Sequence, residues 1–133
     1  MTDEINSYKF ACTIARMTDN KKAGNITILN IGNVSVLADY FVICSADSST
    51  QVRAISEFVK DKIKEIFQRK PIGEEKDEKN RWNLLDYGDV VIHVLHKDER
   101  ETYAIEKFWN HAFIIEEEKW MAESEIFQTL IMQ

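Results

Sequence analysis

The chain has 133 residues, 44% of them hydrophobic, with four glycines and one proline. This size and composition exclude a linker-rich or disordered protein and leave room for one domain with one core. No stretch approaches the ~18 apolar residues of a membrane span, and the N-terminal MTDEINSY resembles neither a secretion signal nor a transit peptide. We therefore expect a cytoplasmic protein without membrane contact.

The formal net charge of −6 is unevenly distributed along the chain. Residues 1–70 carry 10 Lys and Arg against 8 Asp and Glu, whereas residues 71–133 carry 7 against 15. The acidic second half is a poor match for a nucleic-acid backbone, so we expect little direct contact with nucleic acid and favour a basic protein partner. A role of these charges in solubility alone is the alternative.

The first half of the chain predicts a helix, two strands and a second helix. Apolar residues near helical spacing predict a helix over residues 3–20. Strands are expected at Ile26–Ile31 and at Asp39–Ala46, the latter almost continuously apolar. Ser48 is placed to cap a helix over about residues 50–69, whose apolar residues recur at steps of three and four.

The second half predicts a charged loop and then a hairpin. Pro71–Asn80 has no apolar periodicity, which indicates a mobile loop. Trp82–Asp86 and Asp89–Leu95 are expected to be antiparallel strands. Tyr87-Gly88 joins them, because glycine tolerates the positive φ of a tight turn.

A third helix and a tail are predicted after the hairpin. Asp98 and Glu101 have the spacing of a capping box for a helix that extends to about residue 113. Residues 114–133 carry a further helical stripe, which could pack on the domain, on a partner or across a dimer. We therefore divide the chain into an α/β domain over residues 1–113 and a C-terminal helical extension over residues 114–133.

The order of the predicted elements indicates one sheet covered by helices. The second helix is long enough to connect two parallel strands, whereas the Tyr87-Gly88 turn forces an antiparallel pair. The expected fold class is α/β, with a mixed β-sheet covered by helices in a single domain.

The residues do not predict a catalytic centre. His93 and His96 are three apart, but on a strand their side chains point to opposite faces. Asp86 and Asp89 flank a turn and could converge on a cation, although an Asp beside a turn is usually a local hydrogen-bonding device. No phosphate-binding glycine loop or nucleophile–base pair is evident, so we expect no enzyme, no metal and no cofactor.

Two stretches are distinctive, namely DYFVICSADSSTQVRAI at Asp39–Ile55 and WNLLDYGDVVIHVLHKDERETYAIEKFW at Trp82–Trp109. They resemble the Iojap family, also called the ribosomal silencing factor S (RsfS) family, over about residues 5–113. The resemblance implies an α/β fold like that of nucleotidyltransferases, but without their catalytic carboxylate pattern.

The same resemblance implies a function and a partner. Members of the family bind a ribosomal protein, number fourteen of the large subunit, at the face that meets the small subunit. They block subunit joining and lower translation when nutrients are short, and homodimers are seen among them. For this chain the implied partner is the large ribosomal subunit, through a basic ribosomal protein, and a homodimer is left open.

Six partner-binding residues are predicted from the matching positions and their residue types. Aromatic anchors are frequent at protein interfaces, and carboxylates complement a basic partner. The expected anchors are Trp82, Tyr87 and Tyr103, and the expected acidic contacts are Asp86, Asp89 and Glu106. Trp82 could instead only pack the sheet.

Two alternatives compete with this interpretation. One is a magnesium-dependent nucleotidyltransferase-like enzyme or nucleotide-binding protein that uses Asp86 and Asp89. The other is a dimeric scaffold in which the tail, from Trp120 to Ile131, recruits another protein.

Overall fold

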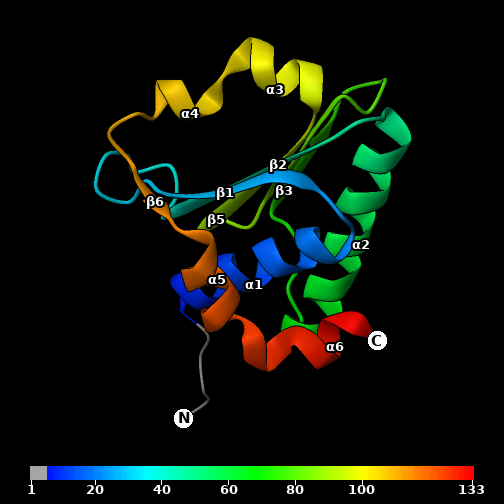
Figure 1. Cartoon of the computed structure of the whole chain (residues 1–133), viewed down its shortest axis with the longest axis vertical. Helices are drawn as coiled ribbons and strands as arrows, with labels where there is room; N and C mark the ends of the chain where they lie inside the picture. Colours follow the sequence, from blue (N-terminus) through cyan, green and yellow to red (C-terminus); the bar gives the residue numbers. More distant parts are fainter. Residues whose placement is uncertain (1–5) are drawn as a thin grey trace.

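One six-stranded sheet forms the centre of the computed structural model, which describes residues 6–133 (Figure 1). The strands lie in the order β3-β4-β5-β2-β1-β6, and of the strand pairs in this range only β2–β5 is parallel. The strands are β1 (Gly24–Asn30), β2 (Tyr40–Ala46), β3 (Gly73–Lys76), β4 (Trp82–Asp86), β5 (Val90–His96) and β6 (Phe113–Ile115). The helices are α1 (Ser7–Asn20), α2 (Ser49–Phe67), α3 (Lys97–Tyr103), α4 (Ile105–Phe108), α5 (Glu117–Glu123), the short 3-10 helix η1 (Glu125–Phe127) and α6 (Gln128–Met132). The predicted mixed α/β fold is confirmed.

Side-chain caps explain where the two long helices begin. The Asn6 side chain accepts a hydrogen bond from the backbone N–H of Lys9 at 2.8 Å, and α1 follows. The predicted cap of α2 is confirmed, because the Ser48 hydroxyl accepts from the backbone N–H of Gln51 at 3.1 Å. Residues 3–5 of the predicted first helix lie outside the described residues. Within residues 6–133 we find no helix with the length and apolar character of a membrane span.

Helices α1, α2, α5 and α6 lie on one face of the sheet, which we call the closed face (Figure 1). Phe10 and Ile14 of α1 are buried there, as are Ile55 and Ile63 of α2. They pack against apolar strand residues such as Ile92. Apolar burial on this scale is the main driving force of folding.

The C-terminal tail contributes to the same core. Trp120 of α5 is 2% exposed and Ile131 of α6 is 1% exposed. Arg16 of α1 connects the tail to the domain, since its Nε donates a hydrogen bond to the Ser124 hydroxyl at 2.7 Å. The predicted boundary after residue 113 falls inside β6, which pairs with β1. The division of the chain there stays a prediction, and the shared core leads us to expect that a chain cut at this point is less stable.

Helices α3 and α4 lie on the opposite face, which we call the open face (Figure 1). The prediction of one continuous helix there is wrong, because Ala104 adopts a left-handed conformation (φ 47°, ψ 54°) that separates α3 from α4. Phe113 lies in β6 and not in a helix. Asp98 is not the cap either, since its own N–H donates to His96 Nδ1 at 3.1 Å. Asp98 instead lies in the first turn, where its charge favours the helix N-terminus.

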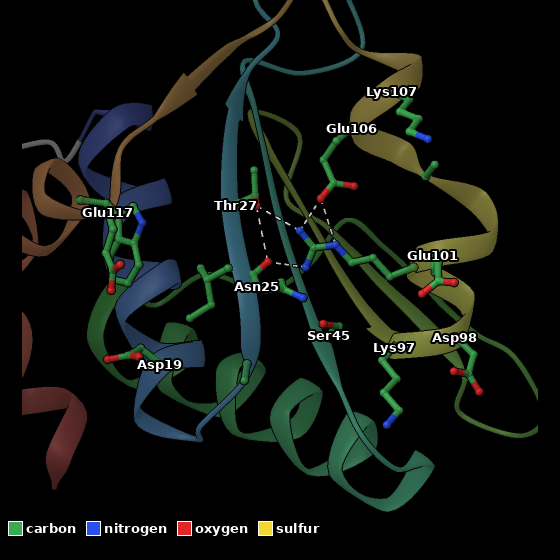
Figure 2. Close-up of a pocket in the computed structure, with 15 residues that line it drawn as sticks. Asp19, Asn25, Thr27, Ser45, Lys97, Asp98, Glu101, Glu106, Lys107 and Glu117 are labelled. Atoms are coloured by element: carbon green, nitrogen blue, oxygen red, sulfur yellow. Dashed lines mark hydrogen bonds and ion pairs between the residues drawn. The ribbon is translucent and has the colours of Figure 1, made fainter.

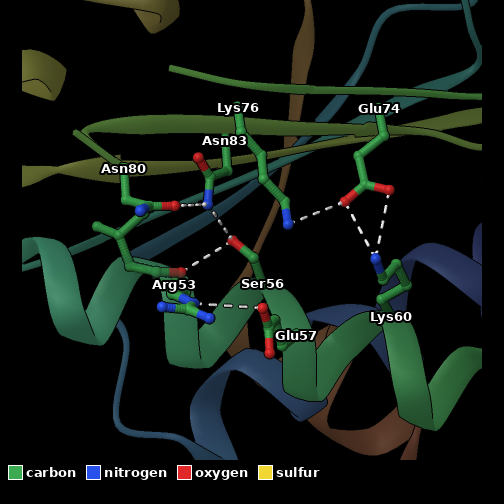
Figure 3. Close-up of polar contacts among 9 residues, drawn as sticks. Arg53, Ser56, Glu57, Lys60, Glu74, Lys76, Asn80 and Asn83 are labelled. Carbon is green, nitrogen blue, oxygen red and sulfur yellow. Dashed lines mark hydrogen bonds and ion pairs between the residues drawn. The ribbon is translucent and has the colours of Figure 1, made fainter. Parts of the chain in front are cut away.

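Pro71–Asn80 contains a strand, which corrects the prediction of a mobile loop. Gly73–Lys76 pairs antiparallel with β4 at the edge of the sheet. An ion pair of 3.1 Å between Lys60 of α2 and Glu74 joins this strand to the helix (Figure 3). The lack of apolar periodicity fits an edge strand that is largely exposed and carries charged side chains.

The predicted β4–β5 hairpin is confirmed. Its turn contains Gly88, whose φ of 92° lies in the region that favours glycine. The Asp86 carboxylate accepts a hydrogen bond from the Gly88 N–H at 2.8 Å and so stabilises the turn. The hairpin places Trp82 next to the end of β5, from which α3 begins.

Candidate partner-binding site

Six rings form a continuous series across the open face. The centroids of neighbouring rings lie 4.7 to 6.1 Å apart. Aromatic rings at such distances stabilise one another beyond the area that they bury. We call this series the aromatic row; its members, in spatial order, are Tyr103, Trp82, His93, Phe41, Trp109 and Phe108. Tyr103 at one end is 57% exposed and Phe108 at the other is 79% exposed.

Trp82 and Tyr103, two of the predicted anchors, lie together at one end of the row. Their ring centroids are 4.9 Å apart. The Trp82 ring is half-buried against the sheet, and its indole N–H donates to His93 Nδ1 at 3.2 Å. The ring therefore packs the sheet and is held in one orientation, while part of it still faces solvent. A rigid aromatic pair of this kind suits an interface because little side-chain entropy is lost on binding.

His93 supports Trp82 from within the sheet. Its side chain is buried, and this burial lowers the pKa of His93 to about 4. The imidazole is therefore neutral near pH 7, and its Nδ1 must be unprotonated to accept from Trp82. The proton then sits on Nε2, which has no hydrogen-bond partner among the residues that the structure describes. This orientation makes His93 a support for the indole.

Glu106, predicted to contact basic residues of a partner, is bound within the chain. The Nε of Arg100 donates to its carboxylate at 3.0 Å, and a second guanidinium nitrogen does so as well. Burial alone would raise the pKa of Glu106, but the hydrogen bonds and charge of Arg100 outweigh it and hold the pKa below the ordinary range. The negative charge of Glu106 is thus compensated by Arg100, which makes Glu106 a weak candidate for a direct contact with a partner.

Asp86, Tyr87 and Asp89 lie at the other end of the hairpin. Trp82 and Asp86 lie four residue steps apart along β4, which corresponds to about 13 Å. Tyr87 is 3% exposed and packs edge-on against Phe10 on the closed face, with centroids 5.7 Å apart. Tyr87 therefore does not offer its ring to a partner, and the six predicted residues do not form one patch.

Asp89 is held by two side chains of the closed face. Arg69 lies 2.8 Å from one carboxylate oxygen, and the Ser7 hydroxyl donates to the other at 2.8 Å. Burial alone would raise the pKa of Asp89, but these hydrogen bonds outweigh it and lower the pKa. The Asp86 carboxylate accepts from the Gly88 N–H, and the Asp89 carboxylate pairs with Arg69. Because each has a different partner, the two carboxylates do not converge on a cation. In residues 6–133 no group of three or more His, Cys, Asp or Glu side chains could hold a metal ion.

A cleft of about 1140 Å³ lies between α3, α4 and the start of β1 (Figure 2). Charged groups of both signs line it, among them Lys97, Glu101 and Lys107, together with Asp19 and Glu117 from the other side. Its basic side chains are Lys97, Arg100 and Lys107, and Arg100 forms an ion pair with Glu106.

Sequence reasoning missed three residues that organise this region. Phe41, inside the distinctive DYFVICSA stretch, forms the middle of the aromatic row. Arg100 and Arg69 each bind a carboxylate that was expected to face a partner. Their roles depend on pairings between distant elements, so spacing along the chain carried no signal for them.

Comparison with known proteins places these features in a family. The model of a family described as "Ribosomal silencing factor during starvation" matches residues 4–129. The chain belongs to the ribosomal silencing factor family. The matched range includes α5 and most of the tail, beyond the stretch in which the sequence motifs were recognised.

Individual relatives agree with this assignment. The chain is 45% identical to the ribosomal silencing factor RsfS of Bacillus subtilis over 108 residues, which are 81% of this chain and 91% of that protein. It is 33% identical to the chloroplastic protein Iojap of Arabidopsis thaliana over 114 residues, 86% of this chain and 47% of that protein. The predicted resemblance to the Iojap and RsfS proteins is confirmed.

Solved structures share the fold. A Bacillus halodurans protein superimposes with a TM-score of 0.69 at 36% identity, covering 82% of this chain and 98% of that one. A Chromobacterium violaceum protein superimposes with a TM-score of 0.76 at 28% identity, covering 80% and 88%. The mixed sheet and its helices are thus a shared architecture.

Proposed function

We propose that this chain is a non-catalytic factor that binds the large ribosomal subunit through the open face and prevents the small subunit from joining. The observation that carries the proposal is the rigid, partly exposed pair of Trp82 and Tyr103 in a ribosomal silencing factor. The proposal extends to the residues around this pair and not to Tyr87, which is buried.

The proposed partner on the subunit is a basic ribosomal protein, the one numbered fourteen. Residues 71–133, which include α3 and α4, carry 15 acidic against 7 basic residues. Such a charge imbalance attracts a basic surface and repels the ribosomal RNA backbone. Aromatic anchors supply the short-range affinity, and the charges steer the encounter.

The proposed mechanism is steric exclusion. A domain bound at the intersubunit face competes with the small subunit for the same surface, so its occupancy lowers the fraction of joined ribosomes by mass action. This requires no chemical step and no cofactor. We place the action in the cytoplasm, where the subunits meet, and under nutrient limitation, when fewer joined ribosomes are needed.

Sedimentation of the purified protein with separated subunits tests the proposal. We expect the protein to migrate with the large subunit in a sucrose gradient and to reduce the joined-ribosome peak when small subunits are added. Trp82→Ala should lose both effects, whereas Ile126→Ala, at a 70% exposed position of the tail, should retain them. A wild-type protein that stays at the top of the gradient while the subunits join normally would contradict the proposal.

Two further parts of the proposal have their own measurements. In cells that lack the factor, transfer to poor medium should leave more joined ribosomes than in the parent strain. The homodimer stays a prediction, and light scattering of the purified chain at several concentrations would test it. Magnesium-dependent nucleotide binding that is lost in Asp86→Asn would favour the enzymatic alternative instead.

A further inference from the structure

Arg100 joins three segments beneath the open face. Its side chain is only 9% exposed. It donates to the Asn25 carbonyl and, at 3.0 Å, to the Thr27 hydroxyl in β1, and it forms the ion pair with Glu106 of α4. Figure 2 labels Asn25, Thr27 and Glu106, and its dashed lines mark these contacts. A buried guanidinium with this many acceptors fixes the distance between the segments that supply them.

The ion pair spans a break in the helical segment. Ala104 lies between Arg100 and Glu106 and adopts a left-handed conformation, which is unfavourable for a non-glycine residue. Such a conformation persists only where the surroundings hold it. The backbone N–H of Ala104 donates to the Arg100 carbonyl at 3.0 Å, and the side chains of Arg100 and Glu106 close the break from the sheet side.

Tyr103 is the residue immediately before this break. Its ring is 57% exposed and lies against Trp82, and α3 ends with it. Helix α4 has only four residues and packs on the open face through the buried Ile105. The direction of the Tyr103 ring therefore depends on how firmly the break at Ala104 is held.

We propose that Arg100 and Glu106 are positioning residues, which hold Tyr103 against Trp82 so that the large subunit meets a preformed aromatic pair. This inference rests on the proposed function. It gives Glu106 a role through Tyr103 and not through contact with a basic partner. Loss of the pair leaves Tyr103 mobile in the free protein, and binding must then restore its order.

A double-mutant cycle measures this dependence. Glu106→Gln keeps the shape of the side chain and removes its charge, and we expect it to weaken large-subunit binding roughly fivefold, the scale for ordering one side chain. In a Tyr103→Ala background the same change should have no further effect, because the residue being positioned is gone. The matched control is Glu57→Gln, which breaks the exposed Arg53–Glu57 ion pair on α2 and should leave affinity unchanged.

A second measurement is independent of the ribosome. The nuclear Overhauser effect between the Trp82 indole and the Tyr103 ring should be present in the wild-type protein and strongly reduced in Glu106→Gln, at temperatures where both are folded by circular dichroism. Equal weakening by Glu106→Gln in both backgrounds would overturn the inference, since it would indicate direct contact or general destabilisation. An unchanged Overhauser effect would also overturn it. If the wild-type protein does not bind the large subunit, the proposed function fails, and the Overhauser effect alone still decides whether Glu106 positions Tyr103.

Discussion

The two faces of the sheet differ in how completely they are covered. The closed face is packed by α1, α2, α5 and α6 and buries large apolar side chains such as Phe10 and Trp120. The open face has only α3 and α4 above it, and its core is smaller. Two of its rings, Tyr103 and Phe108, are left largely exposed. We therefore expect the closed face to supply most of the stability, and we propose the open face as the binding surface.

The polar groups of the two faces also serve different purposes. On the closed face, Arg69 binds Asp89 and stacks over the Phe10 ring at 4.3 Å from its centroid, so its contacts close the end of the core. On the open face, His93 accepts a hydrogen bond from Trp82, and we propose that Arg100 positions Tyr103. Mutations on the two faces should therefore separate stability from binding.

The largest effect is expected from Trp120→Ala on the closed face. The side chain is 2% exposed, and its removal should lower the free energy of unfolding by about 3–5 kcal/mol, the range for truncating a buried aromatic residue. Urea denaturation measures this loss. Phe108→Ala, at a 79% exposed site on the open face, is the control and should change stability by less than ~1 kcal/mol. Similar losses in both variants would remove the distinction between the faces.

Trp82→Ala should show the opposite behaviour. We expect it to weaken large-subunit binding by about 2 kcal/mol or more, roughly 30-fold, because a buried aromatic anchor often carries that much of an interface. Its free energy of unfolding should fall less than that of Trp120→Ala, since the ring is only half-buried. Binding of folded Trp82→Ala with wild-type affinity, measured by microscale thermophoresis, would remove Trp82 from the site.

The free energy of unfolding should depend on pH because the buried His93 imidazole of the open face resists protonation. Burial lowers the pKa of His93 to about 4, whereas an exposed histidine in the unfolded chain titrates near ~6.5. Between these values the unfolded chain binds more protons, so stability falls as the pH falls. We expect a loss of about 2 kcal/mol between about pH 7 and about pH 5.

Two variants assign this loss to one residue. His93→Gln should lose less stability over the same pH interval in urea denaturation, whereas His111→Gln, at an exposed position, should behave like the wild-type chain. Asp89 and Glu106, whose pKa values are lowered, stabilise the fold while they are ionised. Most of their contribution to the loss of stability therefore comes at lower pH, as they become protonated. Equal losses in His93→Gln and the wild-type protein would contradict the assignment.

The smallest effect is expected from salt. Raising the monovalent salt concentration from about 0.1 to about 0.3 M at constant magnesium should weaken large-subunit binding a few-fold, since the acidic half would be screened from a basic partner. Trp82→Ala should have the same salt dependence, because the ring carries no charge. Binding that strengthens with salt would argue for a purely apolar contact.

Local signals predicted much of the fold. Ser48 capped α2 as expected, Gly88 formed the hairpin turn, and the long helix between β2 and the hairpin allowed the parallel β2–β5 pair. These features depend on residues close together in sequence or on helix length alone.

Tertiary contacts account for what could not be predicted. Nothing in the sequence around Ala104 signals a left-handed residue, because alanine favours helices and the break is held by Arg100 and Glu106. The β3 strand required pairing with β4 and the Lys60–Glu74 ion pair. Of the six predicted site residues, Trp82 and Tyr103 came together, whereas Tyr87 turned to the closed face.

Site-specific photocrosslinking tests the central claim most directly. A photoreactive phenylalanine analogue would replace Tyr103 on the open face, or Arg53 on α2, whose side chain is 66% exposed. After irradiation with large subunits, mass spectrometry would identify the crosslinked protein. The account predicts a crosslink from position 103 to one basic large-subunit protein, number fourteen, and none from position 53. A crosslink from position 53 with none from position 103 would contradict it.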